Sequence, residues 1–473
     1  MMAADDLVFV IPTHRLRDVA DTIEHYDEHF RQHGHSVRMI VFDDSDPVTH
    51  EAYYHLLEQT RTHNVLYYVG PREKARLCAW FSERLGERRL HGVVRNLFKT
   101  SYGGNRNCTL MYTLGGLMVS ADDDMRPYAL MEDDPQSLRP GEICRGRLHP
   151  SGQNGYSRQS FDMLSSFLDV LGKPAGQVPD GYERGEVLVD TAMDLESNAS
   201  RGLARENSLL LRRGPLPDDA VVRMAQTFLS GAHDIDALDY IEMFLEDEEM
   251  THPGNLREVY VLAGFRPVVT KRNWRMSCGV AGYDNTSGLP PFFPTQLRFE
   301  DYSHRLWLQQ AGVASAHVDA AQNHVRSNYR RHSPAAEILN EEVSNYLKRK
   351  IRSTLARLDT LGLSFEYEGE VTVPDAQEML DRMIRLCGRS RHAAKTTAHP
   401  ERAENLRRFA ISLENAFSGF KVDVFRPHLM RIVRSVIGTI RDSVGLWPAL
   451  IDICHVKNHC EGLPQVRVRN RRR

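Results

Sequence analysis

The sequence predicts an α/β protein with a mostly parallel sheet, followed by a C-terminal α-helical domain. Over about the first 130 residues, short apolar runs alternate with amphipathic segments, which is typical of strands joined by helices. From Ser333-Pro334 onward, apolar residues recur at helical spacing, at Ile338, Val343, Leu347, Ile351, Leu355 and Leu358. We therefore expect two domains, over residues 1–332 and 333–473.

The predicted elements of the first part alternate in type. They are a strand at Leu7–Ile11 stopped by Pro12, a helix through His25–Phe30, a strand at Val37–Phe42, a helix at Glu51–Thr60, a strand at Val65–Gly70, a long helical piece, and a strand that runs into Asp122.

The pattern is less regular after Pro127. Residues 163–252 are interpreted as intermittent helices, strand character returns near Val259–Thr270, and a helix opens at Glu300 and Asp301. Further helices are expected over Glu401–Phe417 and His428–Ile453.

Composition excludes several classes of protein. The 473 residues include 63 acidic and 60 basic ones, so a net charge of −3 favours neither nucleic acid nor a membrane surface. No apolar run approaches the ~20 residues of a membrane span, and no secretory leader precedes Leu7. Seven scattered cysteines fit a reducing cytoplasm, which is the expected location.

Two C-terminal motifs have a binding and a structural interpretation. "CHVKNHC" at 454–460 could hold zinc, but its halves are too close for the usual finger, which favours a packed helix end. The tail "RVRNRRR" could touch anionic lipid or nucleic acid, but a solvated disordered end is favoured.

Polar residues follow the predicted strands at Thr13, Asp43-Asp44 and Asp122-Asp123-Asp124. The carboxyl ends of parallel strands meet at one edge of a sheet, where ligands bind. Adjacent carboxylates repel unless a cation takes up their charge, so the triplet predicts a metal, alone or bound to phosphate. Asp is also a common turn residue, and that interpretation stays open for the triplet alone.

The order "IPTHRL…VFDDSD…YGGNRN…VSADDDMRP" over residues 7–127 resembles the family-2-like glycosyltransferases of the GT-A fold. "DDSD" is one residue shorter than the acidic segment of that family. The resemblance implies a nucleotide-sugar donor, bound by Pro12, Thr13, Asp43, Asp44, Arg106, Asp122 and Asp123, and a divalent metal on Asp124. The metal would neutralise the diphosphate leaving group. Arg106 could reach that diphosphate or steady the acidic triplet.

The resemblance continues in "FEDYSHRLWLQQAG", residues 299–312. It implies an inverting transfer with Asp301 as general base and Glu300 orienting that base or the acceptor, although acids also suit a helix N-terminus. "DYSHRLW" also resembles a segment of the retaining polypeptide N-acetylgalactosaminyltransferases, so retention is an alternative.

A histidine after this helix completes the metal shell in many such enzymes. His324 is the expected ligand and His317 the reserve, while Arg326 and Arg330 would reach the phosphates. Imidazole with carboxylates suits Mn²⁺, and Mg²⁺ prefers oxygen ligands alone; either ion is expected.

The acceptor is not identified and could be a glycan, a small molecule or a peptide. An insertion at about 150–252 is expected to form the acceptor region, and Trp274 with Tyr283 could offer an aromatic platform or belong to the core. No nucleic-acid partner and no integral membrane segment are expected.

Two other classes compete. A sugar-1-phosphate nucleotidyltransferase needs a glycine-rich loop with arginine after the first strand, and "IPTHRLRD" has no glycine. A non-catalytic scaffold on a transferase fold should lack part of the site, and no part is visibly missing.

Overall fold

The computed structural model describes residues 7–133, 142–150, 155–190, 206–231, 237–246, 248, 258–273, 275–298, 300–310, 312–325, 335–354, 370–417, 419, 421–455 and 462–468. Within these ranges, every helix is too short or too polar to cross a membrane.

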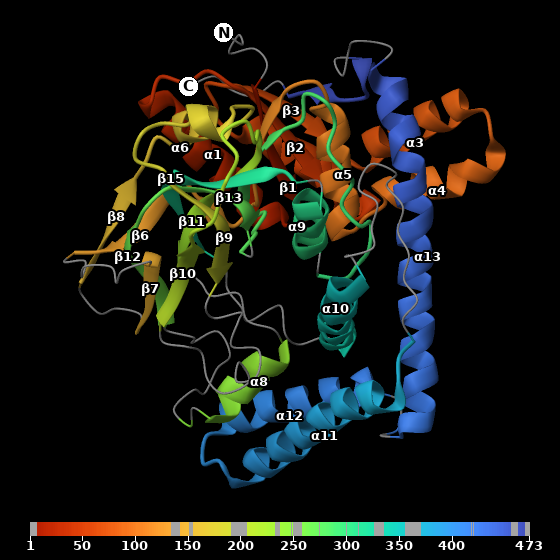
Figure 1. Cartoon of the computed structure of the whole chain (residues 1–473). Helices are drawn as coiled ribbons and strands as arrows, with labels where there is room; N and C mark the ends of the chain where they lie inside the picture. Colours follow the sequence, from red (N-terminus) through yellow and green to blue (C-terminus); the bar gives the residue numbers. More distant parts are fainter. Residues whose placement is uncertain are drawn as a thin grey trace.

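The N-terminal part is a parallel sheet of four strands in the order β3-β2-β1-β4 (Figure 1). These strands are β1 (Leu7–Thr13), β2 (Arg38–Asp43), β3 (Val65–Val69) and β4 (Leu117–Ala121). β1 continues through Pro12 to Thr13, beyond the predicted end. Its pairing with β4 stops at Val10, so residue 12 needs no N–H on that side.

Helices cover both faces of this sheet. They are α1 (Leu16–Gln32), α2 (His50–Gln59), α3 (Pro71–Leu85), α4 (His91–Phe98) and α5 (Tyr102–Tyr112). Tyr26 and Phe30 of α1 pack on Phe9 of β1, whereas Leu110 of α5 belongs to the core on the opposite face with Val10. The expected α/β class is therefore confirmed.

The rest of the sheet is mixed, so the prediction of a mostly parallel sheet is wrong beyond β4. The further strands are β5 (Met125–Arg126), β6 (Tyr128–Glu132), β7 (Glu142–Pro150), β8 (Tyr156–Ser160), β9 (Glu183–Asp190), β10 (Glu206–Arg212), β11 (Val222–Gly231), β12 (Glu258–Phe265), β13 (Val268–Asn273), β14 (Val280–Asp284) and β15 (Ala314–His324). β14 pairs antiparallel with β4, and β11 lies between β14 and β15.

Seven of the described strands form a closed ring in the order β11-β15-β13-β9-β10-β7-β12, and the contact of Gly231 with Tyr260 joins β12 back to β11. Three of these strands lie where intermittent helices were predicted. β11 is buried along nearly its whole length, so it lacks the polar alternation that marks a half-buried strand. The predicted insertion therefore contributes β8, β9, β10 and β11 to the sheet.

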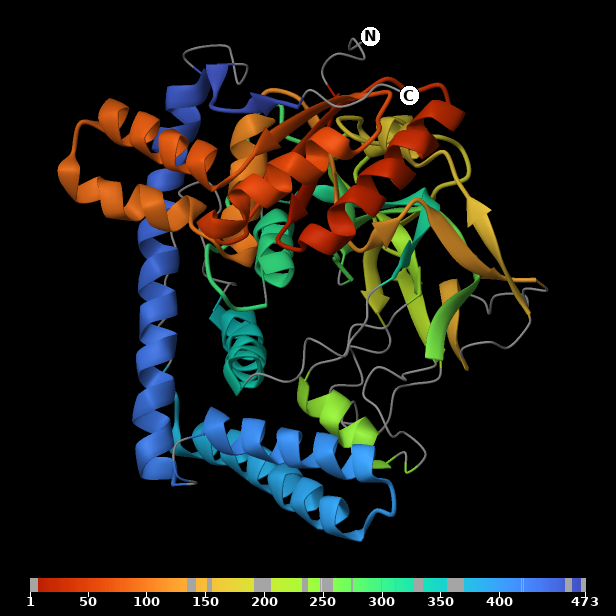
Figure 2. The ribbon, with the colours of Figure 1, turned by 180° about the vertical axis from the view of Figure 1, so that it is seen from behind.

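The C-terminal part contains helices at the three expected places, α10 (Ala335–Thr354), α12 (Pro400–Ala416) and α13 (Val422–His455). It also contains α11 (Val373–Thr396), which was not predicted individually. α11 and α12 lie at the end of the molecule remote from β1–β3, and α8 (Ala237–Glu246) packs on α11 (Figures 1 and 2).

α13 returns from this end to the parallel sheet. It packs on α4, and its Trp447 Nε1 donates to the Leu289 carbonyl at 2.8 Å. Beyond it, β16 (Val466–Arg467) pairs with β3. Residues 333–473 are thus not wholly helical, and the predicted domain limits stay a prediction.

The two C-terminal motifs are described in part. Cys454 is buried near the end of α13, as a packed helix end requires, and residues 456–461 lie outside the described ranges. Of the arginine tail, Arg467 lies in β16 and residues 469–473 lie outside those ranges.

Candidate active site

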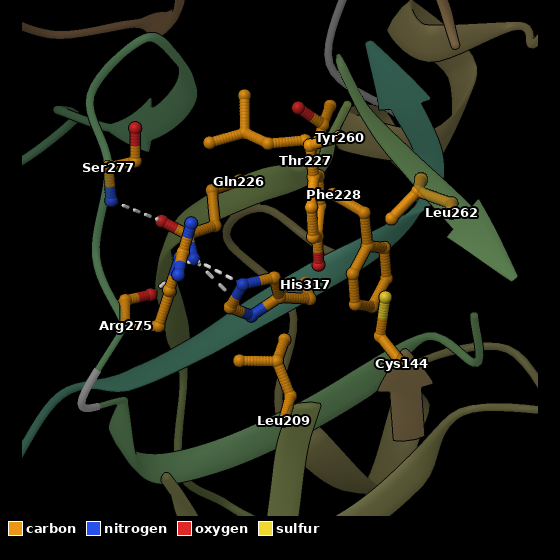
Figure 3. Close-up of a pocket in the computed structure, with 11 residues that line it drawn as sticks. Cys144, Leu209, Gln226, Thr227, Phe228, Tyr260, Leu262, Arg275, Ser277 and His317 are labelled. Atoms are coloured by element: carbon orange, nitrogen blue, oxygen red, sulfur yellow. Dashed lines mark hydrogen bonds between the residues drawn. The ribbon is translucent and has the colours of Figure 1, made fainter. Parts of the chain in front are cut away.

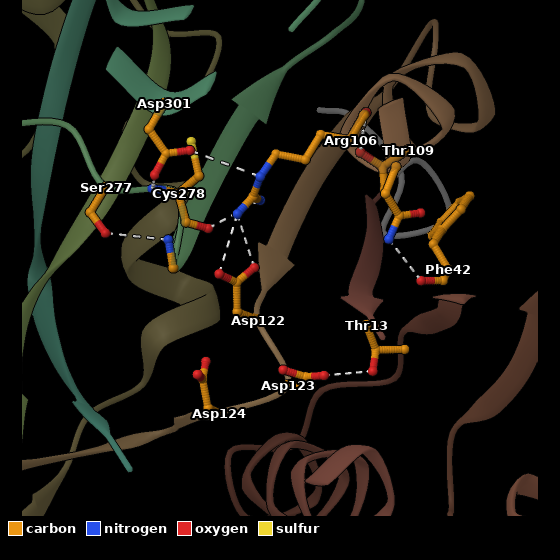
Figure 4. Close-up of polar contacts among 12 residues, drawn as sticks. Thr13, Phe42, Arg106, Thr109, Asp122, Asp123, Asp124, Ser277, Cys278 and Asp301 are labelled. Carbon is orange, nitrogen blue, oxygen red and sulfur yellow. Dashed lines mark hydrogen bonds and ion pairs between the residues drawn. The ribbon is translucent and has the colours of Figure 1, made fainter. Parts of the chain in front are cut away.

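The acidic triplet lies directly after β4, at the carboxyl edge of the parallel strands (Figure 4). Backbone hydrogen bonds hold both of its ends: Asp122 N–H donates to the Gly279 carbonyl at 2.8 Å, and Val325 N–H donates to the Asp124 carbonyl at 2.9 Å. The turn is therefore fixed between the segment that precedes β14 and the end of β15.

Every carboxylate of the triplet is paired with a cationic side chain, and Asp123 and Asp124 share one, which relieves their mutual repulsion. Asp122 accepts from Arg106 at 3.0 and 3.2 Å, Asp123 accepts from Thr13 at 2.6 Å and pairs with Arg15, and Asp124 lies 2.7 Å from Arg15 and 3.3 Å from His324. Burial alone would raise the pKa of Asp124, but His324 and Arg15 hold that pKa well below its usual value.

Sequence reasoning missed Arg15. It lies at the N-cap of α1, directly behind the end of β1, and its guanidinium bridges Asp123 and Asp124. The one sequence feature that pointed to Arg15 was its position two residues after Thr13, the polar end of β1. Arg17 lies on the same short stretch, so residue type alone did not show which of these two arginines pairs with the triplet.

Arg106 connects the triplet to a distant segment. Its guanidinium is buried, donates to Asp122 and to the Cys278 carbonyl at 3.3 Å, and its Nε lies 3.9 Å from Asp301 Oδ1 (Figure 4). Of the two predicted roles, the structure therefore places it where it steadies the triplet. Burial raises the pKa of the Asp122 carboxyl to about 7.

Gly103 and Gly104 allow α5 to bring Arg106 to this position. A Cβ on Gly103 would lie 1.9 Å from the Phe293 carbonyl oxygen, and one on Gly104 would lie 2.1 Å from the Lys99 carbonyl oxygen. The close backbone approach at these two glycines thus serves the packing of the helix start.

Glu300 and Asp301 open α9 (Glu300–Gln310), as predicted. Asp301 Oδ2 accepts the Cys278 N–H at 3.0 Å, whereas its Oδ1 is buried and accepts no hydrogen bond. Burial, together with the Asp301 charge, raises the pKa of Glu300 to about 8. Glu300 therefore keeps its proton at neutral pH.

In the segment that suggested retention, Arg305 and Trp307 are both buried. They lie on α9, and Trp307 packs edge-on against Phe293.

The two acidic residues predicted to bind the nucleotide, Asp43 and Asp44, are held in place by hydrogen bonds within the protein. Asp43 is fully buried and accepts from Tyr68 Oη and Ser45 N–H, both at 2.7 Å. Asp44 accepts from Lys74 Nζ at 2.7 Å and from Ser101 N–H at 2.8 Å, and burial raises its pKa. Of the four residues predicted at this edge, Asp44 is partly exposed, whereas Pro12, Thr13 and Asp43 are buried.

Asp124 and His324 have the donor types and spacing that a divalent ion requires. The carboxylate oxygen and the imidazole nitrogen lie 3.3 Å apart, at the ends of β4 and β15. The described residues contain no group of three or more His, Cys, Asp or Glu arranged around one ion. Two protein ligands suit an ion whose remaining ligands are substrate phosphates and water.

His317, the reserve ligand, lies elsewhere. Its ring contacts Gln226 (Figure 3). The ring also contacts Asn273, and burial lowers the pKa of His317 to about 3. It lines a small pocket of about 20 Å³ among strands of the ring. His317 is therefore not placed beside the triplet.

Of the remaining predicted residues, the structure describes Tyr283. Tyr283 is buried and donates to Cys278 Sγ at 3.1 Å, so it belongs to the core and the platform interpretation is wrong for it. Trp274, Arg326 and Arg330 lie outside the described residues.

Comparison with known proteins adds one similarity. No protein-family model matches the sequence, and no curated protein matches it either. The structure is similar to that of the mannosyltransferase PcManGT from Pyrobaculum calidifontis in complex with GDP-Man and Mn²⁺, with 11% sequence identity over 94% of this chain and 90% of that chain and a TM-score of 0.31. A TM-score of this size does not establish a common fold.

Proposed function

We propose that the protein is a metal-dependent glycosyltransferase of the GT-A kind, which moves a sugar from a nucleotide-sugar donor to an acceptor hydroxyl with inversion. One observation carries this proposal: Asp122–Asp124, His324 and Asp301 come from three separate elements and meet at one sheet edge around Arg106 and Arg15. The reaction needs a cation site for a diphosphate and a separate carboxylate base.

On the donor side, Asp124 and His324 would hold Mn²⁺ or Mg²⁺, which supplies charge neutralisation for the departing diphosphate. Asp44 presents a carboxylate to the ribose or the base, with Lys74 and Ser101 fixing its orientation. Thr13 keeps Asp123 turned toward β1.

On the acceptor side, Asp301 is the proposed base. Its Oδ1 is buried, whereas the side chain as a whole is 31% exposed, so Oδ2 is the accessible oxygen. Beside the bond from the Cys278 N–H, Oδ2 keeps a lone pair to take the proton of the acceptor hydroxyl as the hydroxyl oxygen attacks the anomeric carbon. The bond from the anomeric carbon to the diphosphate oxygen breaks on the opposite face. Neutral Glu300 can donate a hydrogen bond to the acceptor.

The test is a screen of GDP-sugars and UDP-sugars with Mn²⁺, which measures released nucleoside diphosphate. We expect release by the wild type and by Asp319→Asn, an exposed control on β15, and loss of release in Asp124→Asn. Absence of release from any donor would favour the non-catalytic scaffold, and pyrophosphate release from a nucleoside triphosphate and a sugar 1-phosphate would identify a nucleotidyltransferase.

The anomeric configuration of the first-formed product, measured by proton NMR, tests inversion. A retained configuration would favour the retaining alternative.

A further inference from the structure

Arg15 already supplies a positive charge where the divalent ion is proposed to bind. Its Nη1 lies 2.7 Å from Asp124 Oδ2, and this same oxygen faces His324 Nε2 at 3.3 Å. The other terminal nitrogen pairs with Asp123 Oδ1. The side chain is only 26% exposed, so water screens these pairs less than it screens surface ion pairs.

We infer that Arg15 is a resident counter-ion that competes with the divalent ion for Asp124 and turns to the donor diphosphate once the ion has bound. The inference rests on the proposed function and extends it to the coupling of metal and donor. A metal ion and the guanidinium repel each other when both lie at bonding distance from Asp124 Oδ2, so the two cations compete for this oxygen. An ion on Asp124 therefore displaces Arg15 Nη1.

A diphosphate offers the displaced guanidinium a new partner. Arginine binds phosphate oxygens through two parallel N–H groups, and Arg15 stands at the N-cap of the 17-residue helix α1 without a side-chain cap. The first turn of a helix favours anions through its free N–H groups. A phosphate beside Arg15 thus meets two favourable groups at once.

The consequence is positive coupling between metal and nucleotide. Metal binding alone leaves a partly buried guanidinium without one of its carboxylates, whereas metal binding with a diphosphate replaces the lost ion pair. Each ligand then raises the affinity for the other, by the same factor.

The experiment measures Mn²⁺ binding by isothermal titration calorimetry, without nucleotide and with GDP or UDP. The proteins are the wild type, Arg15→Gln, Arg15→Lys, and the control Arg31→Gln, which alters an exposed arginine paired with Glu28 on the same helix. Without nucleotide, we expect Arg15→Gln to bind Mn²⁺ about tenfold more tightly than the wild type, the effect of one partly buried charge. In Arg15→Gln, the factor by which GDP or UDP raises the affinity for Mn²⁺ should fall toward one.

Arg15→Lys keeps the charge and should retain the weak Mn²⁺ binding of the wild type, as should Arg31→Gln. Unchanged or weaker Mn²⁺ binding by Arg15→Gln, with wild-type coupling, would overturn the inference and leave the proposed function standing. If neither the wild type nor Arg15→Gln binds Mn²⁺, GDP or UDP, both the inference and the proposed function fail.

Discussion

At the scale of single residues, Arg106 is the group that ties the two halves of the candidate site together. It contacts Asp122 after β4 and lies 3.9 Å from Asp301 at the start of α9, and its own position depends on the tight start of α5. The roles of the two carboxylates therefore depend on one buried side chain. Two predictions follow at this scale.

Replacing Asp301 with Asn should lower turnover by about 10²- to 10⁴-fold, the usual contribution of a positioned base. The amide oxygen of Asn can still accept the Cys278 N–H, so donor affinity should change little. Steady-state kinetics and calorimetric titration of the nucleoside diphosphate separate these two effects. Near-normal turnover in a folded Asp301→Asn protein would exclude the base assignment.

Glu300 should make stability fall as pH rises. Its carboxyl has a pKa of about 8 in the folded protein, above its value of 4.5 in the unfolded chain, so the folded state binds more protons between these two pH values. Unfolding in urea at pH 5 and at pH 8 should show a smaller loss of stability for Glu300→Gln than for the wild type. The exposed Glu83→Gln on α3 should keep the wild-type difference, and an equal difference in all three proteins would contradict the expectation.

The sequence predicted where these residues would gather more successfully than it predicted what each contacts. Asp124 and His324 are 200 residues apart and lie 3.3 Å from each other, because both follow strands that end at the same edge. The role of Arg15 could not be predicted from its place in the sequence. Arginine is usually exposed, and which carboxylates it pairs with depends on the side chains that the fold brings near it. The burial of Asp43 was hidden for the same reason.

At the scale of elements, the start of α5 packs closely on neighbouring backbone because glycines stand there. Gly103→Ala should destabilise the protein by about 1–3 kcal/mol, because the new methyl group would meet the Phe293 carbonyl. Gly92→Ala on α4, where nothing lies within 4 Å, should be neutral or stabilising by up to about 1 kcal/mol. Urea denaturation of both variants measures the difference, and similar effects would refute the packing argument.

The elements of residues 7–121 could be predicted because apolar runs and helical periodicity are local properties. α2 and β1–β4 lie within a few residues of their expected positions, whereas α1 begins at Leu16, well before the expected His25–Phe30. The seven-stranded ring could not be predicted, because it depends on the pairing of β9 with β13, of β10 with β7 and of β11 with β15. These partners are distant in the sequence, and no local signal selects them. For the same reason, the prediction of a mostly parallel sheet missed the antiparallel pairings of β14 with β4 and β11.

At the scale of the whole molecule, α13 joins the C-terminal helices to the parallel sheet. Trp447 is buried against the core of that sheet and donates to Leu289, so Trp447→Ala should cost about 3–5 kcal/mol of unfolding free energy. Trp80→Ala, which removes a half-buried indole that Arg84 covers, should cost clearly less. Equal losses of unfolding free energy for Trp447→Ala and Trp80→Ala, measured in denaturant, would show that the contact of α13 with the parallel sheet stabilises the protein less than the burial of Trp447 indicates.

The pairing of β16 with β3 has a consequence for how the protein is made. Arg38 and Gln465 are hydrogen-bonded across 427 residues, and Val466 pairs with Tyr68 on the outer edge of the parallel sheet. A ribosome releases β3 long before β16, so the edge of β3 lacks its β16 partner until that strand emerges. An open strand edge recruits other strands, which makes the nascent chain a natural client for chaperones until β16 has paired.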